Sequence, residues 1–258
     1  MRWLRVATLV AAAAIAATQP ATAERLVASL SDRQVMITSN YTGVELVLFG
    51  SVERDVGSAA RPNPYDIVAT VIGPRETLRV RRKQRVLGIW VNIAGRTFVD
   101  PPAYLAVLAS RPLDLIAGAE NRRKLQLGIA DTPFPELINN DIGEVTNDPF
   151  RSELVRLMAE RGLYSEQANA VTFLTPTLFR ASIKLPAQVP IGDYTVDVKL
   201  FADGSLIGHT ALLFKIVKVG FEQFVVEAAS DHGLLYGVAT ACMALLTGWI
   251  ASVAFRRD

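Results

Sequence analysis

Short apolar runs separated by turn residues fill the first part of the chain, and in several of them apolar and polar side chains alternate. A period of two residues is typical of β-strands that bury one face. The runs are 34–38, 44–49, 67–72, 77–81, 87–93 and 104–108. Together with a short start at Leu26 and Val27, they predict about seven strands and a β-sandwich domain over 24–112, for which an immunoglobulin-like sandwich without a disulfide is the natural candidate.

The next segment, 113–167, has helix-compatible stretches between polar loops and is expected to be a mixed helical connector. Its clearest helix is 149–161, where Asp148 suits the N-cap, Pro149 the first turn and Gly162 the end. The apolar positions of this helix form one stripe: Phe150, Leu154, Leu157 and Met158. We expect the stripe to pack on a core rather than bind a cofactor.

A second β-rich unit is predicted over 168–218. Its apolar runs are 181–185, 194–201 and 206–217. Asp203 and Gly204 favour a two-residue hairpin turn between the last two runs. The stretch from Pro190 to Tyr194 resembles the turn into a late sandwich strand, where a tyrosine hydroxyl bonds back across the corner. The unit either folds alone or completes its sandwich with earlier strands.

The N-terminal segment 1–23 has the layout of a cleavable signal peptide. Arg2 and Arg5 precede an apolar stretch, and the small-residue site Ala21-Thr22-Ala23 follows it. Cleavage would leave Glu24 as the first residue. The alternative, an uncleaved anchor, would need a longer apolar stretch.

The C-terminal segment 233–255 contains no charged side chain. At about 1.5 Å per residue it matches the ~30 Å hydrocarbon layer with some tilt. Arg256 and Arg257 follow it, and positive charge stays in the cytoplasm, so the tail 256–258 is expected inside and the main domain outside. The alternative is a buried helix of a soluble domain.

Small residues recur along this predicted membrane helix at steps of three and four, which places them on one helical stripe. They are Gly233, Gly237, Ala241, Ala244, Gly248 and Ser252. Such stripes allow helices to approach closely in lipid, so we predict a helix–helix interface here, against the alternative of a simple anchor. The preceding juxtamembrane segment, 219–232, places apolar side chains at helical spacing and is expected to lie at the membrane surface.

Charge and cysteine content narrow the function classes. From Glu24 to His232 the chain carries 23 basic and 24 acidic residues, so global basicity gives no argument for nucleic acid. The only cysteine, Cys242, lies in the apolar C-terminal segment and excludes an intrachain disulfide. An exported chain without disulfides favours a bacterial periplasmic protein.

The sequence gives little support for catalysis or for metal binding. The only histidines are His209 and His232, and no phosphate loop, nucleophile elbow or spaced zinc motif is present. The acidic and amide residues of 139–148 do not have the spacing of a calcium loop and are expected to be solvated. The sequence therefore predicts no catalytic residues, no metal site and no cofactor.

One basic segment is the strongest candidate contact surface. It comprises Arg79, Arg81, Arg82, Lys83 and Arg85, followed by Trp90. Arg79 and Arg81 are expected on one strand face, and the other three in the hairpin turn. An anion, an acidic loop or lipid headgroups would suit this surface, whereas the alternative is cationic protection of an exposed strand. Arg122, Arg123 and Lys124 are a candidate second half.

Three phrases, in order, resemble a putative transmembrane protein family of alphaproteobacteria whose function is uncharacterised. They are Ile37 to Gly43 before a strand ending Leu48-Phe49-Gly50, then Leu87 to Asn92, then Leu235-Tyr236-Gly237 at the anchor. The resemblance covers nearly the whole chain and implies architecture and lineage, but no catalytic residues. It also suggests a partner related to transport, such as a permease.

These observations together predict a single-pass protein of the bacterial inner membrane with a periplasmic main domain and a cytoplasmic C-terminus. We expect a non-enzymatic accessory or sensing subunit that serves a membrane-protein partner and does not bind nucleic acid. The alternative is an anion or small-solute binding module that uses the basic segment. A hydrolytic enzyme ranks third.

Overall fold

A computed structural model describes residues 24–53, 64–138, 141–143, 148–220 and 229–254. The strands are β1 (Arg25–Leu30), β2 (Gln34–Ile37), β3 (Gly43–Glu53), β4 (Asp66–Ile72), β5 (Leu78–Val86), β6 (Ile89–Phe98), β7 (Leu105–Ala109), β8 (Glu136–Ile138), β9 (Asp141–Gly143), β10 (Tyr164–Gln167), β11 (Val171–Phe173), β12 (Leu178–Pro186), β13 (Gly192–Ala202) and β14 (Ser205–Lys218). The helices are α2 (Leu113–Ile116), α3 (Ala119–Leu125), α4 (Pro149–Glu160) and α6 (Gly233–Ala254).

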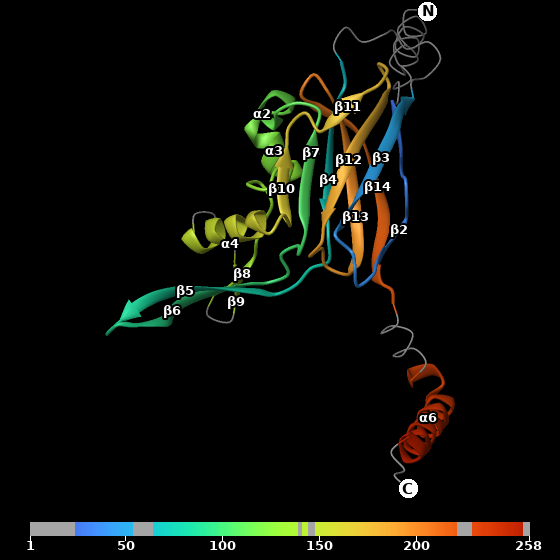
Figure 1. The fold of residues 1–258 in the computed structure, drawn as a ribbon. Coiled ribbons are helices and arrows are strands. Elements are labelled where there is room, and N and C mark those ends of the chain that lie inside the picture. Colours follow the sequence, from blue (N-terminus) through green and yellow to red (C-terminus); the bar gives the residue numbers. More distant parts are fainter. Residues whose placement is uncertain (1–23, 54–63, 139–140, 144–147, 221–228, 255–258) are drawn as a thin grey trace, which may run out of the picture.

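Two sheets face each other in the body of the protein (Figure 1). One has the strand order β1-β3-β12-β11, and the other has the order β10-β7-β4-β13-β14-β2. Most neighbours are antiparallel, but β10 pairs with β7, and β2 with β14, in parallel. The prediction of a mainly β chain is confirmed.

Strands from both ends of the sequence share these sheets. β12 runs antiparallel to β3, with Ile183 opposite Leu46, and β13 runs antiparallel to β4, with Val198 opposite Ala69. The β-rich stretch after residue 168 therefore completes a sandwich with the earlier strands, which is one of the two arrangements that the sequence left open.

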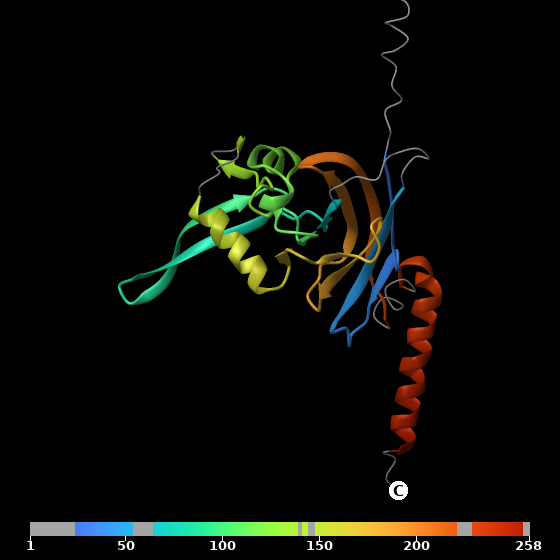
Figure 2. The same cartoon turned by 90° about the horizontal axis from the view of Figure 1, so that it is seen from above.

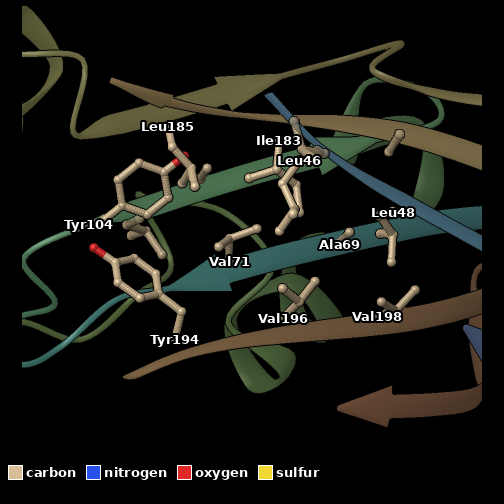
Figure 3. Packing of buried hydrophobic residues seen from close by; sticks show 14 of the residues in the cluster. Leu46, Leu48, Ala69, Val71, Tyr104, Ile183, Leu185, Tyr194, Val196 and Val198 are labelled. Atoms are coloured by element: carbon tan, nitrogen blue, oxygen red, sulfur yellow. The ribbon is translucent and has the colours of Figure 1, made fainter. Parts of the chain in front are cut away.

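Alternate side chains of the facing strands build the core between the sheets. In Figure 3, Leu46 and Leu48 of β3 lie across from Val196 and Val198 of β13 and from Val71 of β4, which pairs with Val196 in the same sheet. All five side chains are almost fully buried. Burial of large aliphatic side chains on both sheets supplies the main stabilising term of the sandwich.

A smaller cluster covers the outer face of the six-stranded sheet. Ile116 and Leu127, from the α2–α3 region, pack with Val68, Val107 and Phe201 of the sheet. Because both faces of β4 are covered, its residues are buried almost without interruption. A strand buried on both faces has a nearly continuous apolar run, as 67–72 does.

The helix predicted at 149–161 is confirmed as α4. The Asp148 carboxylate accepts a hydrogen bond from the Phe150 amide at 2.9 Å, and Pro149 occupies the first turn. Leu154 and Met158 of the stripe are buried in the main core.

The hairpin turn predicted between β13 and β14 is also confirmed. Asp203 and Gly204 have φ values of 49° and 79°. Ala202 and Ser205 pair on either side, so the loop has the two residues with positive φ of a type I′ turn.

The basic segment differs from its prediction. Arg82, Lys83 and Arg85 were expected in a hairpin turn, but they lie within β5, and the turn is formed by Leu87 and Gly88. Consecutive long cations do not show the alternation of a half-buried strand. The strand therefore runs further than its apolar pattern indicates.

Several predicted segments lie outside the described residues. These are the signal peptide at 1–23, the stretch 221–228 of the juxtamembrane segment, parts of the polar loop of 139–148, and residues 255–258, which include the predicted cytoplasmic tail. Asp148, at the end of that loop, is described and caps α4.

Candidate interaction surface

β5 and β6 form a long hairpin, called the arm here, that extends away from the two sheets beside α4 (Figure 2). Its turn is Leu87-Gly88, with φ values of 50° and 90°. Positive φ at both positions is characteristic of a type I′ turn, which fits the twist of the flanking strands. Glycine adopts such φ values readily, whereas leucine does so at a cost.

The register of the arm assigns the cations to its faces. Arg79, Arg81, Lys83 and Arg85 alternate along β5 and therefore share one face, called the cationic face here. Arg85 pairs with Trp90, so the indole belongs to the same face. Arg82 lies on the opposite face. The structure thus confirms the shared face predicted for Arg79 and Arg81.

All four residues of the cationic face are exposed. The arm from 77 to 99 contains six basic residues and no acidic one. Among the described residues, no carboxylate lies within ion-pair distance of the four, and Arg85 Nε donates to the carbonyl oxygen of Gly88 at 3.3 Å. The cationic face therefore presents positive charge that forms no ion pair with a described acidic residue.

The end of the arm is apolar and exposed. We call Val86, Leu87, Ile89 and Trp90 the apolar tip. Leu87 is 101% exposed, Trp90 69% and Ile89 65%. The sequence predicts a strand over 87–93, but Leu87 and Gly88 form the turn and the strand begins at Ile89. The tip was not predicted, because only the position of the turn shows that these side chains have no sheet to cover.

The root of the arm is held against α4 by polar and apolar contacts. Val80 and Phe98 are buried. Arg96, which pairs with Val80, donates from Nε to the Asp148 carboxylate at 3.1 Å, and its guanidinium lies 5.5 Å from the centre of the Phe150 ring. Near the root, the face with Val80 and Arg96 is therefore turned toward α4.

Glu136 of β8 is a buried acidic group beside Arg96 at the root of the arm. Its backbone pairs with Phe98, and its side chain is fully buried, with Oε2 3.9 Å from Arg96 Nε. Neither carboxylate oxygen has a hydrogen-bond partner among the described residues. Burial, and next the Asp148 carboxylate, raise the pKa of Glu136, while Arg96 opposes the shift. Sequence spacing gave no signal for this contact.

Backbone hydrogen bonds fix the arm to the sandwich. The Gly73 amide donates to the carbonyl of Tyr104, and the Ala103 amide donates to the carbonyl of Pro74, at 2.8 and 2.7 Å. The amide of Glu76 adds a third bond, to Pro101. The arm is thus a continuation of β4 and β7 rather than a loose loop.

The arm and the exit of β14 lie at the same end of the sandwich, called the proximal end here. Ile72, the last residue of β4, pairs with Thr195, and Ile216, near the end of β14, pairs with Gly192. β14 is the second neighbour of β4, and strand spacing is about 4.8 Å, so the two strands are roughly 10 Å apart across the sheet. Leu213 lies level with Ile72, and β14 continues from there to Lys218, about 17 Å further along the strand direction. Figure 1 shows both at the lower side.

The small residues predicted as a helix interface all lie in α6. They are Gly233, Gly237, Ala241, Ala244, Gly248 and Ser252, and their period places them on one stripe. A Cβ atom on any of the three glycines would meet nothing within 4 Å, so this stripe is not packed against the described parts of the chain.

The described large apolar side chains of α6 are exposed, including Leu246, Trp249 and Ile250. Thr240 and Thr247 hydroxyls donate to carbonyls of their own helix. In the described ranges, no helix combines the length and apolar character needed to cross a membrane.

The histidines and acidic groups do not converge. His209 is exposed on β14 and pairs with Lys199, and His232 lies beside α6. Within the described part of the chain, no group of three or more His, Cys, Asp or Glu side chains is placed to hold a metal ion. Arg122, Arg123 and Lys124 lie on α3, which packs over the outer face of the sheet and not on the arm.

A comparison with curated proteins found no match. Comparison with protein families gave one, described as "Putative transmembrane protein" (Alph_Pro_TM), over residues 25–257. This range includes the sandwich, the arm and α6, so the resemblance noted in the sequence is confirmed. The chain belongs to this family.

Proposed function

We propose that this protein is a non-enzymatic accessory subunit of the bacterial inner membrane, with a periplasmic sandwich of the immunoglobulin-like type. A signal peptide at 1–23 directs export, the segment 233–255 anchors the chain, and the tail 256–258 is cytoplasmic. The protein serves a membrane-embedded partner, for which a transport permease is the first class to test.

The observation that carries the proposal is the arm. A hairpin with an exposed cationic face and an exposed apolar tip costs solubility and contributes little to the core. Exposed apolar groups next to uncompensated charge are typical of interaction surfaces. Its fixed root gives such a surface a defined orientation relative to the sandwich.

Three observations support the membrane anchor. The family is described as "Putative transmembrane protein", 233–255 carries no charge, and the described apolar side chains of α6 are exposed. The threonine hydroxyls of α6 are satisfied within the helix, as a lipid environment requires. Arg256 and Arg257 favour a cytoplasmic C-terminus.

Affinity purification of the full chain from native membranes in mild detergent tests the subunit hypothesis. We expect a membrane protein to copurify. A variant with Gly237→Leu and Gly248→Leu should still insert into the membrane. Recovery of the copurifying membrane protein should fall by about tenfold, since close approach of the two helices is lost. The matched control, Leu246→Ala with Ile250→Ala on the opposite face of α6, should retain it. A wild-type chain that purifies alone would contradict the hypothesis.

A second candidate function is binding of a small anion. A cavity of about 480 Å³ lies between the arm and α4, and Arg81, Arg82 and Lys83 line it together with Phe150 and Glu153. Calorimetric titration of the full chain in detergent with inorganic phosphate or sulfate tests this function. Saturable heat that Arg82→Ser removes would support a binding module.

A further inference from the structure

We infer that the arm binds the anionic lipid surface of the membrane in which the chain is anchored, with Val86, Leu87 and Ile89 of the apolar tip among the acyl chains, and with Trp90 and the cationic face at the headgroups. This inference rests on the proposed anchoring. It assigns the arm a ligand of one class, an anionic bilayer surface.

The turn residue Leu87 is unfavourable both for the turn and for solubility. Type I′ turns strongly prefer Asn-Gly, because both positions need positive φ, yet the first position is leucine at φ 50°. Its side chain is fully exposed and packs on nothing that the structure describes. Neither turn formation nor core packing accounts for a leucine here, whereas insertion into an apolar phase does.

The order of side chains along the arm matches the depth profile of a bilayer surface. Leu87 is at the end, Arg85 and Trp90 follow, and Lys83 and Arg81 lie nearer the root. At about 3.3 Å per residue, Arg85 is roughly 7 Å behind Leu87, and apolar groups of interfacial segments enter about 5–10 Å. Tryptophan and arginine favour the headgroup level.

This order also favours lipid over a protein partner. A protein surface recognises an individual arrangement of groups and does not require apolar, aromatic and cationic positions to be layered along one axis. Four exposed basic residues on one face, with no acidic residue among them, fit a surface of uniform negative charge.

The position of the arm at the proximal end makes the contact possible. The last residue of β14, Lys218, and the end of β4 are at the same end of the six-stranded sheet. Residues 219–232 can span at most about 50 Å, so the anchor keeps this end near the bilayer. The arm itself is about 30 Å long, from nine residues of β5.

The test uses the full chain in liposomes. Trp3→Phe and Trp249→Phe leave Trp90 as the only tryptophan. Liposomes contain brominated phosphatidylcholine, with or without about one-quarter phosphatidylglycerol. We expect Trp90 emission to shift to the blue and to be quenched by the bromolipid when phosphatidylglycerol is present. About 0.5 M salt should weaken the quenching, because it screens the headgroup charge.

Two variants and one control make the result specific. Leu87→Asn should improve the turn while removing at least about half of the quenching, since the apolar tip is lost. Arg81→Ser with Lys83→Ser and Arg85→Ser should abolish the difference between the two liposomes. The control combines Trp90→Phe and Leu174→Trp with the same Trp3→Phe and Trp249→Phe changes, so that its only tryptophan lies in the β11–β12 connection. The emission of this tryptophan should not be quenched.

Flotation of the liposomes after an alkaline wash separates the two proposals. A chain that does not float contradicts the proposed anchoring. A chain that floats while Trp90 is quenched no more than the Leu174→Trp control overturns only the lipid inference. Crosslinking of the arm to a protein in native membranes, together with unquenched Trp90, would show that the arm binds a protein instead.

Discussion

The Tyr194 hydroxyl donates a hydrogen bond to the carbonyl oxygen of Pro190, four residues earlier, at 2.6 Å. The ring is fully buried and stacks on Phe214 at a centroid distance of 4.9 Å. Burial raises the pKa of Tyr194, which keeps the hydroxyl protonated as a donor. This contact is the corner predicted from the sequence, and it fixes the entry of β13 next to Pro74 at the root of the arm.

Replacing Tyr194 with phenylalanine should lower the free energy of unfolding by about 1–2 kcal/mol. The substitution keeps the ring but leaves the Pro190 carbonyl without its partner. Urea unfolding of the full chain in mild detergent measures the change. Tyr41→Phe is the matched control, because the Tyr41 hydroxyl is 3.4 Å from the Leu185 carbonyl and its loss should cost less than about 0.5 kcal/mol. Equal losses would contradict the structural role of the corner.

Local signals in the sequence identified the features of the fold that depend on neighbouring residues. The cap of Asp148, the Asp203-Gly204 turn and the Tyr194 corner each involve side chains within four residues of one another. Such features follow from the conformational preferences of a few residues.

Features that depend on distant pairing were harder to predict. The parallel contacts of β2 with β14 and of β10 with β7 each depend on a strand of only four residues, β2 and β10, whose sequence does not indicate the partner strand. The extension of β5 through Arg85 is specified by the pairing with β6 and not by an apolar pattern. Tertiary context decides strand formation at such positions.

The candidate surface was identified in part. The basic residues and Trp90 stood out in the sequence as an unusual cluster of charge near an aromatic residue. Strand alternation correctly placed Arg79 and Arg81 on one face. The location of the cations away from the turn and the exposure of Leu87 depend on the register of the arm. The contact of Arg96 with Asp148 depends on a helix about 50 residues away in the chain.

Glu136 predicts a pH dependence of stability. Its carboxyl has a raised pKa in the fold, whereas in the unfolded chain it titrates near its ordinary value of 4.5. The folded state therefore binds more protons between these two pKa values, and the contribution of Glu136 to stability falls as pH rises through this window.

Glu136→Gln removes the titrating group while keeping the size of the side chain. The variant should be at least as stable as the wild type at neutral pH, and its stability should decrease less as pH rises from about 4.5 to 7. Unfolding of both proteins by urea over this range measures the difference. Parallel stability curves would show that the Glu136 carboxyl is not perturbed by burial.

The central claim is that the chain is held in a membrane with its sandwich and arm outside the cytoplasm. Labelling of single cysteines in whole cells tests this claim most directly. Cys242→Ala removes the only native thiol, and Leu174→Cys and Asp258→Cys then place one on the exposed connection before β12 or on the C-terminal tail. With the outer membrane permeabilised, a membrane-impermeant maleimide should label Leu174→Cys in intact cells and Asp258→Cys only after lysis. Labelling of Asp258→Cys in intact cells, with Leu174→Cys protected until lysis, would contradict the account.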